Sequence, residues 1–212
     1  MLHYLPGCDV NKNHKEAGNK ITNYMISKGI QIEECCRSHD SLANLHDTII
    51  QNCTMCQLIL KEVQKAKVIS LYEYVLEDPS FPFVDMKGKE ITIQDCWRTK
   101  DDQRLHEAIR ECLRRMNYKI VEMDTCKEKS EFCGVWNLDH LTPIALDLAP
   151  DTFGKLEKQI KVYREEEKIE IMKQWCKQFN SDVVCYCNGC EKGLRIGGIE
   201  PIHMIELLAK GL

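Results

Sequence analysis

The chain repeats one order of segments twice, and this order constrains the fold more than any other feature of the sequence. Each copy begins with a short apolar run that ends at a cysteine, HYLPGC in the first and EITIQDC in the second. Helical patterns, further apolar runs and further cysteines follow, and the copies close on the similar segments VISLYEYVL and IEPIHMIELL. Alternating strands and helices are typical of α/β layers with mostly parallel strands.

We therefore predict an α/β fold of two pseudo-symmetric repeats, each with mostly parallel strands and flanking helices. The first cysteine-rich repeat is predicted over residues 1–78, a linker with Pro and Gly over 79–90, and the second repeat over 91–212. The second repeat contains an insertion around Pro143 to Phe179. Apolar residues recur there at spacings of three and four, which predicts a long helix.

Cysteine is unusually frequent, with 13 residues in a chain of 212. The N-terminal apolar run is too short for a signal peptide, and no apolar stretch approaches the roughly 18 residues of a membrane span. We therefore expect a cytoplasmic protein without a membrane span. Because thiols are kept reduced in that compartment, the cysteines indicate metal binding or redox chemistry more than a disulfide framework.

The charge pattern argues against a nucleic-acid partner. The formal net charge is -4, and Lys and Arg are mixed with acidic residues, as in KLEKQIKVYREEEKIE. Nucleic-acid binding depends on clustered positive charge that neutralises phosphates. We therefore expect no nucleic-acid partner.

The spacing of the cysteines predicts metal sites at the C-terminal ends of the strands. In open α/β sheets ligands collect at that edge, where loops converge and helix N-termini face the site. Two thiolates separated by two residues can turn toward one metal centre, whereas adjacent cysteines diverge and suit two irons of an extended cluster. Strand ends are predicted just before Cys8, Cys53, Cys96 and Cys187. The pairs separated by two residues are Cys53 with Cys56 and Cys187 with Cys190. The adjacent pair is Cys35 with Cys36.

The set of motifs resembles the cysteine-rich (CCG) domain of heterodisulfide reductases. A lone cysteine after Pro-Gly, a Cys-Cys pair and a Cys-x-x-Cys pair occur in that order, and the pattern is duplicated up to the closing PIHMIELL. The same domain occurs in the iron-sulfur subunits of glycolate oxidase, lactate utilisation and anaerobic glycerol-3-phosphate dehydrogenase. The resemblance covers nearly the whole chain.

The resemblance implies that each half binds an iron-sulfur centre and that the protein is an oxidoreductase subunit. It would transfer electrons to a disulfide or similar acceptor, and in the family the centres are noncubane [4Fe-4S] clusters held by five cysteines. By position, the metal ligands implied in the first half are Cys8, Cys35, Cys36, Cys53 and Cys56, and those in the second are Cys96, Cys133, Cys187 and Cys190.

The sequence departs from the family motif Cys-Cys-Gly in both halves. The first half has Cys35-Cys36-Arg37 and the second Phe132-Cys133-Gly134, so only the first keeps five cysteines. We expect a [4Fe-4S] cluster in the first half, with the noncubane type as one option, and a cubane cluster, a zinc ion or no metal in the second. Cys126 and Cys185 are alternatives for the missing fifth thiolate. Catalysis, if present, would belong to the first half, although no catalytic residue is assigned.

Other functions stay open at this point. A structural zinc protein would explain four ligands in the second half but not the fifth cysteine of the first. A metal-free dithiol oxidoreductase that uses Cys53 and Cys56 would explain one pair and ignore the repeat. The chain also lacks a Gly-x-Gly-x-x-Gly motif, a P-loop and a ferredoxin-type cysteine run. Ferredoxin-like iron-sulfur subunits and flavin subunits are therefore the expected partners. Cys112 and Cys176 lie within helical patterns and are expected to be core residues.

Overall fold

The computed structural model describes residues 1–34, 48–63, 67–134 and 137–212. The described chain is an α/β protein with two four-stranded parallel sheets and flanking helices, as predicted. It divides into two compact units. The first unit comprises Met1–Val84, Pro143–Gly154 and Ile205–Leu212, and the second comprises Asp85–Thr142 and Lys155–Met204. The predicted repeat boundaries describe the sequence, and they stay a prediction.

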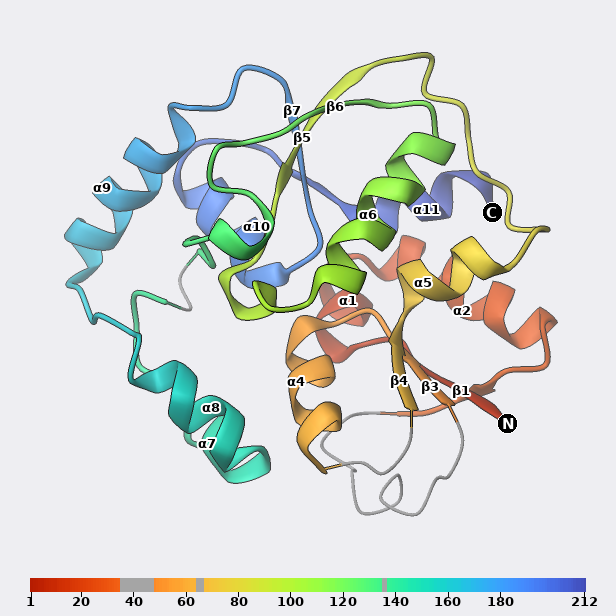
Figure 1. Ribbon diagram of the computed structural model, residues 1–212, viewed down its shortest axis with the longest axis horizontal. Coiled ribbons are helices and arrows are strands. Elements are labelled where there is room, and N and C mark those ends of the chain that lie inside the picture. The colour runs from red at the N-terminus through yellow and green to blue at the C-terminus, as the bar shows by residue number, and fades with distance from the viewer. Residues whose placement is uncertain (35–47, 64–66, 135–136) are drawn as a thin grey trace. The chain divides into compact units, whose positions relative to one another are not determined.

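The first unit is built on a sheet with the strand order β2-β1-β3-β4, in which every pair is parallel. Helix α4 lies next to β4, and Figure 1 shows β1, β3 and β4 side by side. Its elements in chain order are β1 (Leu2–Leu5), α1 (Cys8–Asn13), α2 (Lys15–Ser27), β2 (Gln31–Ile32), β3 (Thr48–Gln51), α4 (Thr54–Val63), β4 (Lys67–Ser70) and α5 (Leu71–Glu77).

The core of the first unit forms where the apolar faces of its helices meet the sheet. Ile49 and Ile50 of β3 are fully buried because a parallel strand is covered on both faces. Ile21 and Met25, four residues apart on α2, are also fully buried, as one face of an amphipathic helix should be. Helix α5 begins with a capping box in which Ser70 and Glu73 satisfy each other's backbone N–H groups.

The second unit has a sheet with the strand order β6-β5-β7-β8, again parallel throughout. Val183 and Val184 of β7 are buried, as are Ile109 and Leu113 on one face of α6. Its elements are β5 (Glu90–Gln94), the 3₁₀ helix η2 (Trp97–Thr99), α6 (Gln103–Arg115), β6 (Lys119–Val121), the 3₁₀ helix η3 (Lys127–Lys129), α9 (Glu165–Cys176), β7 (Asp182–Cys185), α10 (Asn188–Ile196) and β8 (Ile202–His203).

The insertion is not one long helix, so that prediction is wrong. The structure has α7 (Pro143–Leu148), α8 (Pro150–Glu157) and α9, with non-helical chain from Ile160 to Arg164. Pro150 lacks a backbone N–H and favours the first position of a helix, so it separates α7 from α8. Glu62 of α4 accepts hydrogen bonds from the N–H groups of Asp151 and Thr152 and so caps α8. The last elements are α11 (Met204–Leu208) and η4 (Ala209–Gly211).

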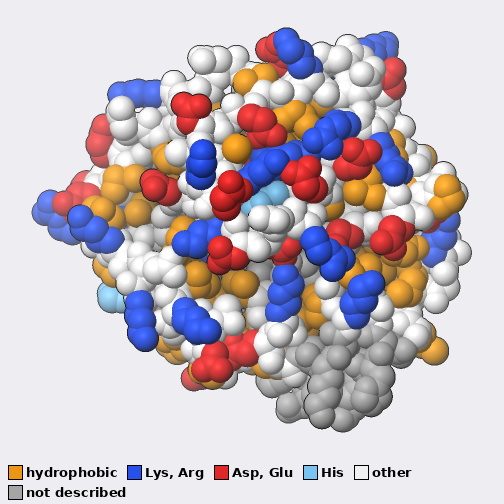
Figure 2. Space-filling model, in the orientation of Figure 1, with side chains coloured by type: hydrophobic (Ala, Val, Ile, Leu, Met, Phe, Trp, Pro, Cys, Tyr) orange, Lys and Arg blue, Asp and Glu red, His pale blue; other side chains and the backbone are white. Residues whose placement is uncertain are grey.

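The surface carries charges of both signs. Figure 2 shows basic and acidic side chains interspersed over the visible face, in line with the mixed pattern of the sequence. Among the helices that the structure describes, none combines the length and the hydrophobicity that a membrane crossing requires.

Candidate metal centre

Four cysteines of the second unit meet at one point. The sulfur atoms of Cys96, Cys133, Cys187 and Cys190 all lie within 4.8 Å of one another. The Sγ atoms of Cys96 and Cys133 are 3.3 Å apart, and those of Cys133 and Cys187 are 3.9 Å apart. All four residues are at most 2% exposed. These are the four cysteines that the sequence assigns to the second half, and together they could hold a metal ion or an iron-sulfur cluster.

Three separate segments bring these cysteines together. Cys96 follows the end of β5 by two residues, and Cys187 follows the end of β7 by two. The strands are in register there, with Gln94 opposite Cys185, so both cysteines leave the sheet at the same edge. Cys187 is the N-cap residue of α10, and Cys190 lies in its first turn. The helix N-terminus favours negative charge, which stabilises a thiolate at this position.

The third segment, with Cys133, approaches α10 so closely that only glycine fits. Gly134 has φ +55°, and a Cβ atom there would lie 1.8 Å from the carbonyl oxygen of Gly189. The backbone of Gly134 also lies against Gly193, whose own Cβ would be 2.4 Å from the Gly134 Cα. The glycine that follows Cys133 therefore permits the contact that places its sulfur beside those of the Cys-x-x-Cys pair.

A buried arginine lies directly against the sulfurs. Arg98 belongs to η2, two residues after Cys96, and is 7% exposed. Its Nε donates to the Cys133 sulfur at 3.2 Å, and its Nη2 donates to the Cys187 sulfur at 3.0 Å. One guanidinium therefore contacts two cysteines that come from different segments.

Three of the four cysteines have strongly shifted pKa values. Burial, followed by hydrogen bonds with Cys133 and Cys187, raises the pKa of Cys96 and of Cys190 well above the ordinary value. Hydrogen bonds with Cys133, Cys190 and Cys96 hold the pKa of Cys187 well below it, and Arg98 lowers it further. Burial would lower the pKa of Arg98, but the nearby cysteines raise it more, and the net direction is upward. The pKa of Cys187 therefore moves in the opposite direction to those of Cys96 and Cys190.

These residues fit a metal ion in charge and in spacing. A divalent cation would let all four sulfurs ionise together, because an opposite charge at the centre favours each thiolate. In a tetrahedral site with metal–sulfur bonds of about 2.3 Å, neighbouring sulfurs are about 3.8 Å apart. The two observed separations, 3.3 and 3.9 Å, lie on either side of that value. The thiolates of a [4Fe-4S] cluster bind four different irons and lie further apart.

A buried polar network anchors the loop that carries Cys96. Asp95 forms an ion pair with Arg110 at 2.7 Å, and both side chains are fully buried. Tyr186 donates to Asp95 at 3.1 Å, and its hydroxyl oxygen accepts the Cys96 N–H at 3.0 Å. Arg110 also pairs with Glu122 at the surface, which satisfies the rest of its guanidinium. The backbone of Cys96 is therefore held by Tyr186, while Arg110 of α6 holds the neighbouring Asp95.

The cysteines of the first unit have a different setting. Cys8 is exposed, Cys53 is half-buried and Cys56 is buried. Among the described residues, these three alone form no group as close as the four of the second unit. The other two predicted ligands, Cys35 and Cys36, lie outside the described residues, so the five-cysteine set stays a prediction.

The loops of the first unit nevertheless start from one sheet edge. Leu5 at the end of β1 is opposite Gln51 at the end of β3, and Cys8 and Cys53 follow by three and two residues. A Cβ atom on Gly7 would lie 3.2 Å from the Cβ of Cys53, so the two loops are adjacent. Cys53 directly precedes α4, as Cys187 precedes α10.

The remaining cysteines lie outside the group of four. Cys185 is the last residue of β7, and burial raises its pKa well above the ordinary value. Cys126 is half-buried, and burial raises its pKa too. Neither belongs to the close group. Cys112 and Cys176 are buried, as predicted for core residues.

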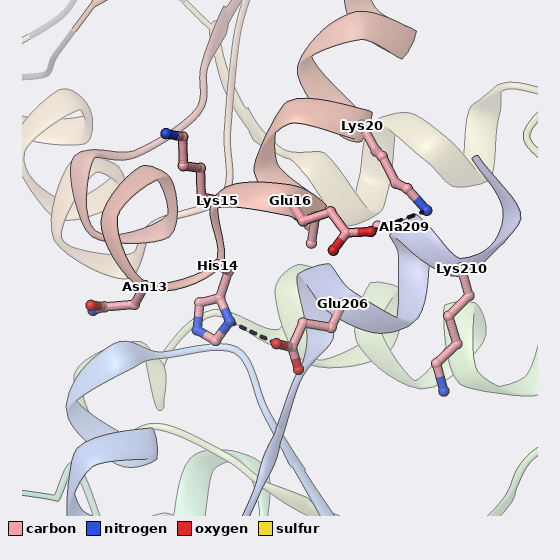
Figure 3. Close-up of a pocket in the computed structure, with 9 residues that line it drawn as sticks. Asn13, His14, Lys15, Glu16, Lys20, Glu206, Ala209 and Lys210 are labelled. Atoms are coloured by element: carbon pink, nitrogen blue, oxygen red, sulfur yellow. Dashed lines mark hydrogen bonds and ion pairs between the residues drawn. The ribbon is translucent and has the colours of Figure 1, made fainter.

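A hollow of about 360 Å³ lies at the start of α2. Figure 3 shows two pairs among its charged side chains. His14 Nδ1 is 3.0 Å from Glu206, and Lys20 is 3.9 Å from Glu16. Because its charges are of both signs and the drawn carboxylates have basic neighbours, we assign this hollow no chemistry.

Arg98, Asp95 and Tyr186 belong to the site but are absent from the sequence-based predictions. In the segment DCWRT, Arg98 follows the predicted ligand Cys96 by two residues, and Asp95 directly precedes it. Those positions beside a predicted ligand were the only sequence signals for the two residues. Tyr186 between Cys185 and Cys187 gave no signal, because its contact with Asp95 depends on the pairing of β5 with β7.

Comparison of this chain with known protein families, with curated proteins and with solved structures finds no match. The site geometry and the motif resemblance are therefore the basis for a functional proposal.

Proposed function

We propose that the chain is a metal-thiolate subunit of an oxidoreductase that transfers electrons to a disulfide or similar acceptor. The observation that carries this proposal is the convergence of four buried cysteines from three segments in the second unit. The direction of the chemistry comes from the resemblance to the cysteine-rich domain of heterodisulfide reductases. Ferredoxin-like iron-sulfur subunits and flavin subunits are the proposed partners.

We also propose that the two units are copies of one repeat with a metal site at the strand ends of each. Three features support this. The strand orders β2-β1-β3-β4 and β6-β5-β7-β8 are the same when each set is numbered from its own first strand. A Cys-x-x-Cys pair enters α4 in one unit and α10 in the other. Each unit's last strand, β4 or β8, runs directly into a short helix, α5 or α11.

The two proposed sites differ in kind. The close sulfurs of the second unit suit a single tetrahedral ion with no open position, which is the geometry of a closed site. The first unit offers more cysteines and an exposed Cys8, which suits an extended iron-sulfur cluster open to an acceptor. We therefore assign the redox step to the first unit.

An iron-sulfur cluster, when bound, supplies single-electron transfer and an iron that can take a substrate sulfur. The residues of this chain hold and orient it. Cys53 and Cys56 would be ligands at the N-terminus of α4, where the helix dipole favours the negative charge of thiolates. The exposed Cys8 would lie on the side open to the acceptor.

A second function is favoured by one specific observation. The sulfur separations of 3.3 and 3.9 Å fit zinc as well as they fit a single iron. If zinc occupied this centre and the first unit held no cluster, the chain would be a structural zinc protein rather than a redox subunit.

Metal and sulfide analysis of protein purified without oxygen separates the two functions. The redox proposal predicts iron and acid-labile sulfide in the purified chain, with the sulfide and the iron bound with it lost in a Cys53→Ser, Cys56→Ser double variant. The zinc alternative predicts zinc alone, unchanged in that variant. Zinc without iron or sulfide, even after reconstitution with both, would contradict the redox proposal.

A further inference from the structure

Arg98 has an unusual position for a charged side chain. It is 7% exposed. Its guanidinium donates two hydrogen bonds to sulfur atoms, one to that of Cys133 and one to that of Cys187. Burying a positive charge costs several kcal/mol unless a negative partner is close. Two cysteines of the candidate centre lie against this guanidinium, and their sulfurs accept its hydrogen bonds.

The geometry of the guanidinium lets it connect two segments. Its Nε atom donates to Cys133 in the loop, and its Nη2 atom donates to Cys187 at the start of α10. A lysine ammonium is a point charge and lacks this fixed fork. Arg98 therefore fixes the position of one ligand relative to the other.

The charge of the centre gives a second reason for an arginine. Four thiolates around one divalent ion carry a net charge of about -2, which is unfavourable in a buried site. The guanidinium reduces that charge without occupying a coordination position. The residue comes from the same short segment as a ligand, because η2 begins directly after Cys96.

We propose that Arg98 is the internal counter-cation of the four-cysteine centre and positions the sulfurs of Cys133 and Cys187 for metal binding. The inference rests on the proposed metal centre, but it applies to zinc and to iron alike. Outer partners of metal ligands commonly change metal affinity by about 10- to 100-fold when they are removed.

The test is cobalt binding by the full chain, measured without oxygen by competition with a chromogenic chelator. Cobalt bound by thiolates gives a sulfur-to-metal charge-transfer band, and the part of this band that Cys96→Ser removes reports the second-unit centre. We expect Arg98→Met to weaken that binding by about 10- to 100-fold and to shift the band, because two N–H donors to sulfur are lost. Arg98→Lys should lose less affinity, because it keeps the charge.

Arg114→Met is the matched control, since Arg114 is an exposed arginine of the same unit, with a side chain 52% exposed. It removes one positive charge and should leave both affinity and band unchanged. Circular dichroism checks that each variant folds, and Arg98→Lys carries the test if Arg98→Met does not fold. An unchanged affinity and band in a folded Arg98→Met or Arg98→Lys chain would overturn the role of Arg98 alone. A wild-type chain with no Cys96-dependent band would overturn the metal centre and this inference with it.

Discussion

The cysteines of the two units occupy comparable places in their sheets but have very different exposure. In the second unit the four sulfurs are close and at most 2% exposed. In the first unit Cys8 is exposed and Cys53 is half-buried. Both sets begin at the ends of parallel strands, so the strands alone do not decide whether a site is closed.

The difference arises in the loops. The loop of Cys96 is held by Asp95 and Tyr186, and the loop of Cys133 lies against α10 through Gly134. Before Cys8 the chain has Pro6 and Gly7 instead, and Gly7 turns with φ +81°. The side chains at the base of the Cys96 loop hold its cysteine within the buried group of four, whereas Cys8 follows the turn at Gly7 and is exposed.

The largest expected effect is the loss of one proposed ligand from the proposed closed centre. Cys133→Ser should abolish stable metal binding there. With metal at about 1,000 times its dissociation constant, binding contributes about 4 kcal/mol to the free energy of unfolding. Its loss should lower the thermal midpoint by on the order of 10 °C in a chain of this size.

Cys8→Ser is the paired variant in the first unit. Because Cys8 is exposed, its replacement should change the thermal midpoint much less. Scanning calorimetry of both metal-loaded variants makes the comparison. Equal losses from the two substitutions would remove the distinction between a closed and an open site.

A slightly smaller effect is expected from Gly134→Ala. The new Cβ would meet backbone atoms of Gly189 that cannot move aside easily, so the Cys133 loop must shift away from α10. We expect a loss of about 3 kcal/mol or more in the free energy of unfolding, and weaker cobalt binding. Gly88→Ala is the control, because Gly88 has φ +73° but open space around it.

Gly88→Ala should cost only the backbone strain of about 1–2 kcal/mol and leave the metal affinity unchanged. Chemical unfolding and chelator competition on both variants provide the readouts. If Gly134→Ala bound cobalt as tightly as Gly88→Ala, the close contact would not position Cys133.

The anchoring network predicts a moderate effect. Asp95→Asn keeps the shape of the side chain but removes the negative charge that faces buried Arg110. We expect about 2–3 kcal/mol of destabilisation, because a hydrogen-bonded partner of a buried charge is weakened. Glu122→Gln, at the half-exposed end of the same network, should cost less than about 1 kcal/mol. Urea unfolding of the two variants tests this order, and the reverse order would place the anchor at Glu122.

The smallest predicted effect depends on pH. His106 is fully buried, and within the described part of the chain neither ring nitrogen has a hydrogen-bond partner. Burial lowers its pKa below 6.5. Because the unfolded chain then binds the proton more readily than the folded one, this group's contribution to stability is full above pH 6.5 and is lost as the pH falls through the lowered pKa.

His106→Leu should therefore stabilise the protein by about 1 kcal/mol at pH 7.5, since unpartnered buried nitrogens are removed. At pH 5.5, which is one unit below 6.5, the gain in the free energy of unfolding should be larger by at most about 1.4 kcal/mol. This is the free energy that corresponds to one pH unit. Urea unfolding at both values measures the difference, with chelator present throughout so that metal release is equal. A gain that is larger at pH 7.5 would contradict the assigned direction.

Much of the fold and part of the site followed from local sequence patterns. Apolar runs that end at cysteines correctly placed β5 and β7. Cys96, Cys187 and Cys190 were named from local patterns, the strand ends and the Cys-x-x-Cys spacing, whereas Cys133 was implied only by the family resemblance. The insertion was misjudged because the apolar spacing continued through Ile160 and Tyr163, which lie in the non-helical chain between α8 and α9.

The contacts around the sulfurs were beyond sequence reasoning. Arg98 meets Cys133 and Cys187 across 35 and 89 residues of chain, respectively, and such pairs are set by the packing of loops. The choice of fifth ligand also needed the structure. Cys185 proved to be the end of β7, while Cys126 lies beside η3, and neither joins the close group.

The central claim is that the second unit holds a closed single-ion centre, unlike the first. X-ray absorption spectroscopy at the iron and zinc edges tests it most directly. The sample is a Cys53→Ser, Cys56→Ser chain that is purified without oxygen and reconstituted with iron, sulfide and zinc. We predict four sulfur neighbours at about 2.3 Å with no second metal nearby, and the loss of this signal in a chain that also carries Cys133→Ser. A metal–metal distance typical of an iron-sulfur cluster, dependent on Cys133, would contradict the claim.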